Sequence, residues 1–169
     1  MTEEVFYTVA AYGSVDGATK SWRKWLSAAT ELAHSNGYQI THLELQGESF
    51  KGSKMLTFSR ARARLDAALD RKERLEWVGL YDLPPGFGTA AFDFRFVADR
   101  SRFGNYAAVT FDRLIETTER RRIAEMLKQH VVHERGEVFR LGRDEFRTGY
   151  LCRLKPAKEF RSLRVLSRF

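Results

Sequence analysis

The feature that most constrains the fold is a strict alternation of side chains across Ala90–Ala98. One side of the alternation carries Ala90, Phe92, Phe94, Phe96 and Ala98, and the other carries Ala91, Asp93, Arg95 and Val97. A period of two is typical of a β-strand. We therefore predict a strand whose phenylalanines pack inward while Asp93 and Arg95 meet solvent. Tyr106–Phe111 follows after a charged turn, Asp99–Asn105, and should pair with it as an antiparallel hairpin.

Further strands are expected wherever short β-branched or aromatic runs end in turn residues. These runs are Val5–Tyr12, Tyr38–Leu45, Leu75–Tyr81, Glu137–Leu141 and Thr148–Leu154. The Gly47–Ser53 stretch reads as a polar loop, because its only large apolar residue is Phe50.

Three segments instead show the helical period. The first begins at Thr19 or Ser21 and ends before Gly37; its apolar stripe consists of Trp22, Trp25, Leu26, Ala29, Leu32 and Ala33. A second should run from about Thr57 or Ser59 to Asp70. A third should span about Thr117–Val132, with Ile123, Met126, Leu127 and His130 on one stripe. Such stripes bury one face of a helix against a core.

The strands and helices together predict an α+β fold, with a mixed, mainly antiparallel sheet and about three helices packed on one face of it. The 169 residues contain no repeat or linker that would divide them. We expect a single domain over residues 1–169, in which residues 156–169 form a basic C-terminal tail that could be a helix, a strand or an arm.

Cysteine use and hydropathy indicate a cytoplasmic protein. Cys152 is the only cysteine, so no internal disulfide can form, and its leucine neighbours favour a small buried side chain over a nucleophile. The first residues are acidic where a secretory signal would be basic, and no apolar run approaches the roughly 18 residues of a membrane span.

Motifs for catalysis, metals and cofactors are missing from the sequence. It has no Gly-x-Ser-x-Gly, Cys/His or Ser-x-x-Lys element in a persuasive catalytic context, and no glycine-rich phosphate loop. His130, His133 and Glu134 are close in sequence, but a zinc site needs a fuller ligand set. We expect no catalytic residue, no metal ligand and no cofactor. The remaining alternative is an enzyme whose active site carries no known motif.

The net charge of +7 raises nucleic-acid binding as an alternative. Residues 151–169 hold six basic residues and one acidic residue, so +5 of this charge lies in the C-terminal segment. Arg120–Arg122 and the basic tail could neutralise phosphates. Interleaved acids weaken that reading, since Glu116, Glu119 and Glu125 lie at spacings that favour ion pairs on a helix surface.

Two loops are the candidate recognition surface, because loops usually carry the function that a rigid scaffold presents. The Asp82–Gly88 loop offers Asp82 and Phe87. The Asp99–Asn105 loop offers Asp99, Arg100, Arg102 and Phe103. Aromatic and arginine side chains dominate protein-interface hot spots, although both loops could equally be ordinary hairpin ends.

The order of these elements resembles that of immunity proteins from bacterial polymorphic-toxin systems, over roughly residues 5–154. The matching parts are Phe6–Val9, Trp22–Ala33, Ala90–Ala98, Tyr106–Asp112, Ile123–Leu127 and a closing Thr148–Leu151 strand. The resemblance implies a non-enzymatic cytosolic protein that neutralises a cognate toxin by forming a tight complex. Because this chain is basic, we expect a toxin with an acidic surface, or a toxin site that is recognised by its shape more than by its charge. The alternative is a nucleic-acid-associated regulator using Arg120–Arg122 and the tail.

Overall fold

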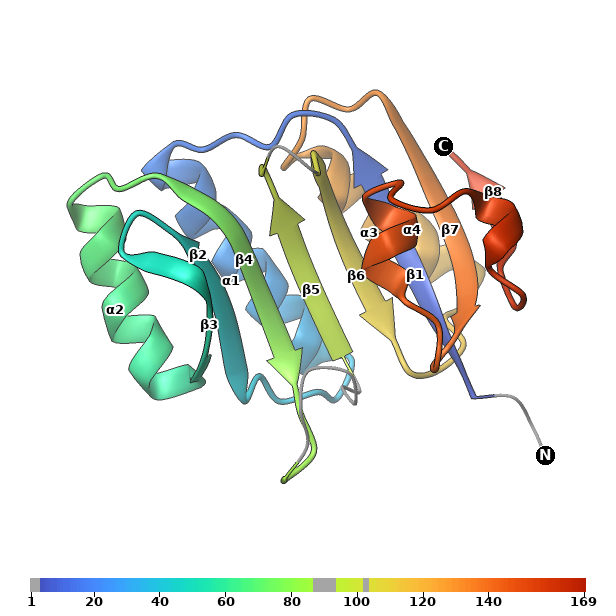
Figure 1. Cartoon of the computed structure of the whole chain (residues 1–169), viewed down its shortest axis with the longest axis horizontal. Coiled ribbons are helices and arrows are strands. Elements are labelled where there is room, and N and C mark those ends of the chain that lie inside the picture. Colours follow the sequence, from blue (N-terminus) through green and yellow to red (C-terminus); the bar gives the residue numbers. More distant parts are fainter. Residues whose placement is uncertain (1–3, 87–93, 102–103) are drawn as a thin grey trace.

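A single antiparallel sheet organises the protein (Figure 1). The computed structural model describes residues 4–86, 94–101 and 104–169. Eight strands lie in the order β3-β2-β4-β5-β6-β1-β7-β8, and each neighbouring pair is antiparallel. The strands are β1 Val5–Tyr12, β2 His42–Gly47, β3 Phe50–Thr57, β4 Leu75–Asp82, β5 Phe94–Asp99, β6 Tyr106–Phe111, β7 Arg135–Gly142 and β8 Arg164–Arg168.

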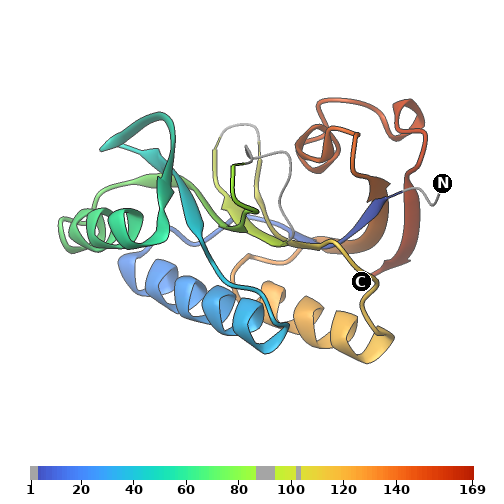
Figure 2. The same ribbon diagram turned by 90° about the horizontal axis from the view of Figure 1, so that it is seen from below.

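The helices lie on both faces of this sheet. They are α1 Thr19–Ser35, α2 Phe58–Asp70, α3 Thr117–Lys128, α4 Arg147–Leu151 and the 3₁₀ helix η1 Ala157–Glu159. Figure 2 shows α1 and α3 side by side on one face, with α4 and η1 on the other. Helix α2 packs on β2 and β3 near the opposite edge. The predicted α+β class, with three long helices on a mainly antiparallel sheet, is confirmed.

The core between α1, α3 and the sheet follows from the two sequence periods. The predicted α1 stripe is buried in full, and Trp25 lies 5.1 Å from Phe96 between ring centroids. Trp22 meets Trp25 edge to face at 5.8 Å. A fully buried aromatic or aliphatic side chain contributes roughly 1.5–3 kcal/mol, so this layer supplies much of the stability.

Two predicted elements are wrong. The Thr148–Leu154 segment is no strand: Arg147–Leu151 forms helix α4, whose Leu151 packs on the sheet beside Phe139. The Gly47–Ser53 stretch is not a loop, because only the Glu48–Ser49 turn separates β2 from β3. Phe50 is 1 % exposed and begins β3, an edge strand whose other early residues face solvent and therefore look polar in the sequence.

The C-terminal half contains two further differences in detail. Helix α3 ends at Lys128, four residues before the predicted end, because Val131 leaves the helix to bridge Val15. The tail, whose conformation the sequence left open, continues from η1 into β8, which pairs with β7 at the edge of the sheet. Its basic residues are thereby held along one edge.

Candidate functional site

The two predicted recognition loops lie at opposite ends of the sheet. Asp82 pairs with Phe94 at one end of the β4–β5 ladder, and Asp99 pairs with Trp77 at the other. A five-residue separation along a strand spans about 17 Å. Phe87, Arg102 and Phe103 lie outside the described residues. Asp82 and the Asp99–Arg100 pair therefore do not form one surface.

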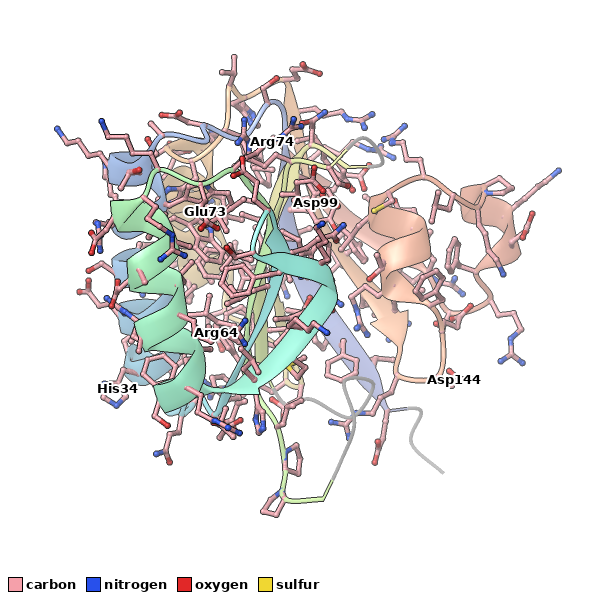
Figure 3. The ribbon with its side chains drawn as sticks, turned by 60° about the vertical axis from the view of Figure 1, so that its left-hand side comes forward. His34, Arg64, Glu73, Arg74, Asp99 and Asp144 are labelled. Atoms are coloured by element: carbon pink, nitrogen blue, oxygen red, sulfur yellow. The ribbon has the colours of Figure 1, made fainter. Side chains whose placement is uncertain are left out.

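Within these loops, Asp99 is not an exposed contact residue as predicted. It is 2 % exposed, and its Oδ1 accepts a hydrogen bond from the Ser101 backbone N–H at 2.8 Å. Burial raises the pKa of its carboxyl group. Figure 3 labels Asp99 among the side chains beside α4. It is part of the packed interior, because the strand β5 continues to this residue.

Arg100 and Asp82 are partly exposed but already engaged. The guanidinium of Arg100 donates to the Leu75 carbonyl at 3.4 Å, and a Cβ on Gly17 would lie only 1.9 Å from its Nη1. The Asp82 carboxylate accepts from the Gln39 backbone N–H at 3.0 Å. Both side chains tie neighbouring segments together, which is a structural role.

Arg95 was expected at the surface, and that expectation is wrong. It is 7 % exposed on the sheet face away from α1 and α3, and its Nη2 donates to Thr148 Oγ1 of α4 at 3.2 Å. Its guanidinium carbon lies 5.4 Å from the Trp77 ring centroid. The alternation correctly places Arg95 on the sheet face opposite α1 and α3. That face is not open to solvent at Arg95, because α4 covers it.

Glu44 provides the negative charge in this buried polar cluster. Its Oε2 accepts hydrogen bonds from Tyr81 OH at 2.6 Å and from Trp77 Nε1 at 3.1 Å. Burial, together with nearby Glu44, raises the pKa of Tyr81, so this phenol stays protonated. These hydrogen bonds form a partly buried network that fixes β2, β4 and β5 relative to one another.

Cys152 borders the same cluster, and its environment favours the thiol. The Sγ atom lies 3.8 Å from both Asp99 Oδ2 and Tyr106 OH. Burial raises the pKa of the Cys152 thiol. A raised pKa lowers the thiolate fraction, and the thiolate is the reactive form. Cys152 is only partly buried, so the prediction of a buried side chain holds only in part.

The histidines near the end of α3 have separate surroundings. His130 is 7 % exposed, and burial lowers its pKa to about 4. His133 instead stacks on Phe169, with ring centroids 5.7 Å apart. Among the residues that the structure describes, no three or more His, Cys, Asp or Glu side chains gather in a way that could hold a metal ion.

The arginines of α3 do not form one basic patch. Arg120 donates from Nε to the Ile115 carbonyl at 2.7 Å and, with Arg121, lines the side of α3 that faces away from α1. Arg122 lines the opposite side, against α1, where it pairs with Glu119 at 2.7 Å. The segment is therefore divided between two sides of its helix.

A groove of about 440 Å³ lies between α3 and the C-terminal edge of the sheet. We call it the α3–β8 groove. Its apolar side chains are Ala124, Val138, Leu166 and Phe169, and its basic side chains are Arg120, Arg121 and Arg168. Leu166 is 41 % exposed although it is a leucine in a strand. Sequence reasoning missed this groove because its residues come from three separate segments.

The position of the groove follows from the spacing of layers. Helix α3 packs against β1, while β7 and β8 extend the sheet beyond it (Figure 2). Strands lie about 4.8 Å apart, and packed helices about 8–10 Å apart. A further helix packed beside α3, which lies on β1, would therefore be displaced by two strands and would lie over β8. The groove is the place where the helical layer ends before the sheet does.

No protein family, curated protein or solved structure matches this chain. In the part of the chain that the structure describes, no helix is long and apolar enough to cross a membrane.

Proposed function

We propose that the protein is a non-enzymatic binding protein that neutralises a cognate bacterial toxin by forming a tight complex, and that the α3–β8 groove receives an acidic amphipathic helix of that toxin. The observation that carries this proposal is the combination of an apolar floor and a basic rim in one groove. An apolar stripe on the partner would cover Leu166 and Phe169, and its acidic side chains would meet Arg121 and Arg168.

A helix suits this groove better than an added strand. The register between β7 and β8 shifts at Val138/Phe139, so Leu166 has no partner opposite it in the β7–β8 ladder. Bulges, short length and charged side chains are the devices that discourage strand addition at a sheet edge, and β8 has all three. A helix contacts side chains instead, in the recurring mode in which an amphipathic helix lies in an apolar groove.

Charge supports an acidic partner. Glu125 is the one acidic side chain lining the groove, and it is paired with Lys128 at 2.7 Å. No acidic side chain of the groove therefore neutralises Arg120 or Arg121, while Arg168 lies 3.8 Å from Glu137 on the other face of the sheet. Complementary charge at an interface raises the association rate and excludes wrong partners, which a toxin antidote requires.

The test begins with capture of the partner from a native lysate treated with nuclease, followed by purification of the captured protein. We expect its expression alone to arrest growth and co-expression of this protein to restore it. Binding of the purified partner should weaken at least tenfold in Leu166→Asp and in Arg121→Glu, because the first places a charge on the apolar floor and the second reverses the rim.

Matched controls separate the groove from general effects. Val132→Asp places the same charge on another exposed apolar side chain, 72 % exposed and outside the groove. Arg60→Glu makes the same charge reversal on α2. Both should bind like the wild type. A parallel capture omits the nuclease. Recovery of nucleic acid alone from that sample, with no protein partner in either sample and an affinity that falls steeply as salt rises, would contradict the proposal and favour a nucleic-acid-associated regulator.

A further inference from the structure

A second concave site lies on the other face of the same sheet edge. It is a pocket of about 460 Å³ between the segment after α4 and the start of β7. We call it the basic pocket. Its charged side chains are Glu137, Arg153, Lys155 and Arg168, and two tyrosines, Tyr12 and Tyr150, complete its polar lining. This volume is within the range of about 300–1,000 Å³ that small-molecule sites occupy.

The single acid in the pocket is already engaged. Glu137 is 8 % exposed, and its Oε2 accepts a hydrogen bond from Tyr150 OH at 2.8 Å. Its Oε1 lies 3.8 Å from Arg168 Nε. Three cationic side chains surround this one carboxylate, so the lining has a net charge of +2, carried by exposed groups. A dianion would complement that charge.

Arg153 occupies a backbone position that is unfavourable for it. Its φ is 56°, the left-handed conformation that follows a helix end and that glycine adopts without cost. The guanidinium carbon lies 5.7 Å from the Tyr12 ring centroid, which places the charge at the pocket. Glycine at this position would relieve the unfavourable backbone conformation.

Of the two tyrosines, Tyr12 is the one that can donate to an anion, because Tyr150 donates its single hydroxyl proton to Glu137. Burial raises the pKa of Tyr150 to about 12, with a further contribution from its hydrogen bond to Glu137. Burial also raises the pKa of Tyr12. Both phenols therefore remain protonated at neutral pH.

We propose that the basic pocket binds a small phosphate monoester through Arg153, Lys155 and Arg168. Arginine suits this class because its planar guanidinium matches phosphate oxygens in a two-point hydrogen-bonded geometry. A phosphate monoester is a dianion near neutral pH, which is the charge that the lining leaves unbalanced. This site lies on the other face of the sheet edge and shares only Arg168 with the α3–β8 groove, and its test needs no protein partner.

The chain offers a closely matched control for Arg153. Lys72 follows the end of α2 with the same φ of 56°, and its N–H bonds to Leu69 as that of Arg153 bonds to Tyr150. Replacing either residue by glycine removes one positive charge and relieves the same backbone conformation. Both variants should fold at least as well as the wild type, and Lys72 lies outside the basic pocket.

The experiment is a calorimetric titration of the full chain with ribose 5-phosphate and with inorganic phosphate, at constant ionic strength in chloride. We expect saturable one-site binding to the wild type and to Lys72→Gly, and at least tenfold weaker binding to Arg153→Gly. If the affinity for ribose 5-phosphate fell equally in both variants, the fall would reflect the net charge of the protein and not the pocket, and the proposal would be overturned. Wild-type affinity in Arg153→Gly, or binding of a single-stranded oligonucleotide without any binding of ribose 5-phosphate, would also overturn it.

Discussion

Thr8 and Thr110 show how single residues hold the sheet together where it buries polar groups. They face each other across β1 and β6, both are at most 2 % exposed, and their hydroxyl oxygens are 2.9 Å apart. A lone buried hydroxyl loses its hydrogen bonds with water and gains none in return. Removing one partner should therefore cost more than removing both.

The first prediction follows from this pair. Thr8→Val should lower the free energy of unfolding by about 1–2 kcal/mol, because it leaves the Thr110 hydroxyl unsatisfied in a buried site. The double variant Thr8→Val/Thr110→Val should recover most of that loss, since valine matches the shape of threonine. Urea unfolding of the two single variants and the double variant measures the coupling. Additive losses would refute the pairing.

His130 provides a prediction about pH. Burial, with a smaller contribution from Lys24, lowers its pKa from 6.5 to about 4. Between these values the unfolded chain binds a proton that the folded protein excludes, so stability is lost as pH falls from 6.5 toward 4. After allowance for solvent screening, the loss is about 1–2 kcal/mol.

Urea unfolding at pH 7 and pH 4.5 measures this term. The difference in unfolding free energy between the wild type and His130→Gln should shrink by about 1–2 kcal/mol at the lower pH. His34, labelled in Figure 3, is exposed near the end of α1. His34→Gln should therefore show the same pH dependence as the wild type, and a constant difference for His130→Gln would contradict the assignment.

At the scale of elements, the C-terminal segment is part of the sheet and not a detachable arm. Phe160 is 7 % exposed and meets Tyr150 edge to face at 5.6 Å. Ser162 Oγ accepts the Gly142 N–H at 2.6 Å, so the chain after η1 is fixed to the end of β7. Deleting residues 156–169 would remove these contacts and expose β7 as a new edge. Point variants are the sounder probes of the tail.

Phe160→Ala should lower the free energy of unfolding by about 2–4 kcal/mol, because it removes a buried ring from the second face of the sheet. For a chain of this size, that corresponds to a fall in Tm of roughly 6–12 °C. Leu154→Ala is the control: Leu154 is 57 % exposed and should change stability by less than about 0.5 kcal/mol. Thermal melts followed by circular dichroism compare the two, and equal melting temperatures would show that the tail does not pack as described.

Long periodic elements were predictable from the sequence, whereas short ones required tertiary context. Helix α1 and the β5–β6 hairpin follow from unambiguous periods of 3.6 and 2. Helix α4 has only five residues, and its β-prone Thr148 and Tyr150 made it look like a strand. Its helical form depends on packing against a sheet that no local pattern describes.

The candidate sites were the least predictable part. The recognition residues proposed from loops were chosen by residue type and assumed exposure, and burial of Asp99 contradicts that assumption. The α3–β8 groove and the basic pocket depend on how far the sheet extends beyond its helices. The extension of the sheet could not be predicted, because β8 lies in residues 156–169, whose conformation the sequence does not determine.

At the scale of the whole molecule, β8 separates two basic sites on opposite faces of one edge. Arg168 lines both the α3–β8 groove and the basic pocket, whereas Arg121 lines only the groove and Arg153 only the pocket. When a ligand in one site holds the Arg168 side chain, that side chain is less able to contact a ligand in the other site. Occupation of the basic pocket should therefore weaken binding of an acidic partner in the groove, and the coupling should be reciprocal.

This coupling gives the last prediction. Arg168→Met keeps the apolar stem and removes the charge, so it should weaken both phosphate-ester binding and partner binding by about three- to tenfold, the equivalent of roughly 1 kcal/mol. Arg153→Gly should weaken only phosphate-ester binding, and Arg121→Glu should weaken only partner binding. Calorimetry with ribose 5-phosphate and with the purified partner measures all three variants. An unchanged affinity for either ligand in Arg168→Met would show that Arg168 contributes to only one of the two sites. The two sites would then bind their ligands independently.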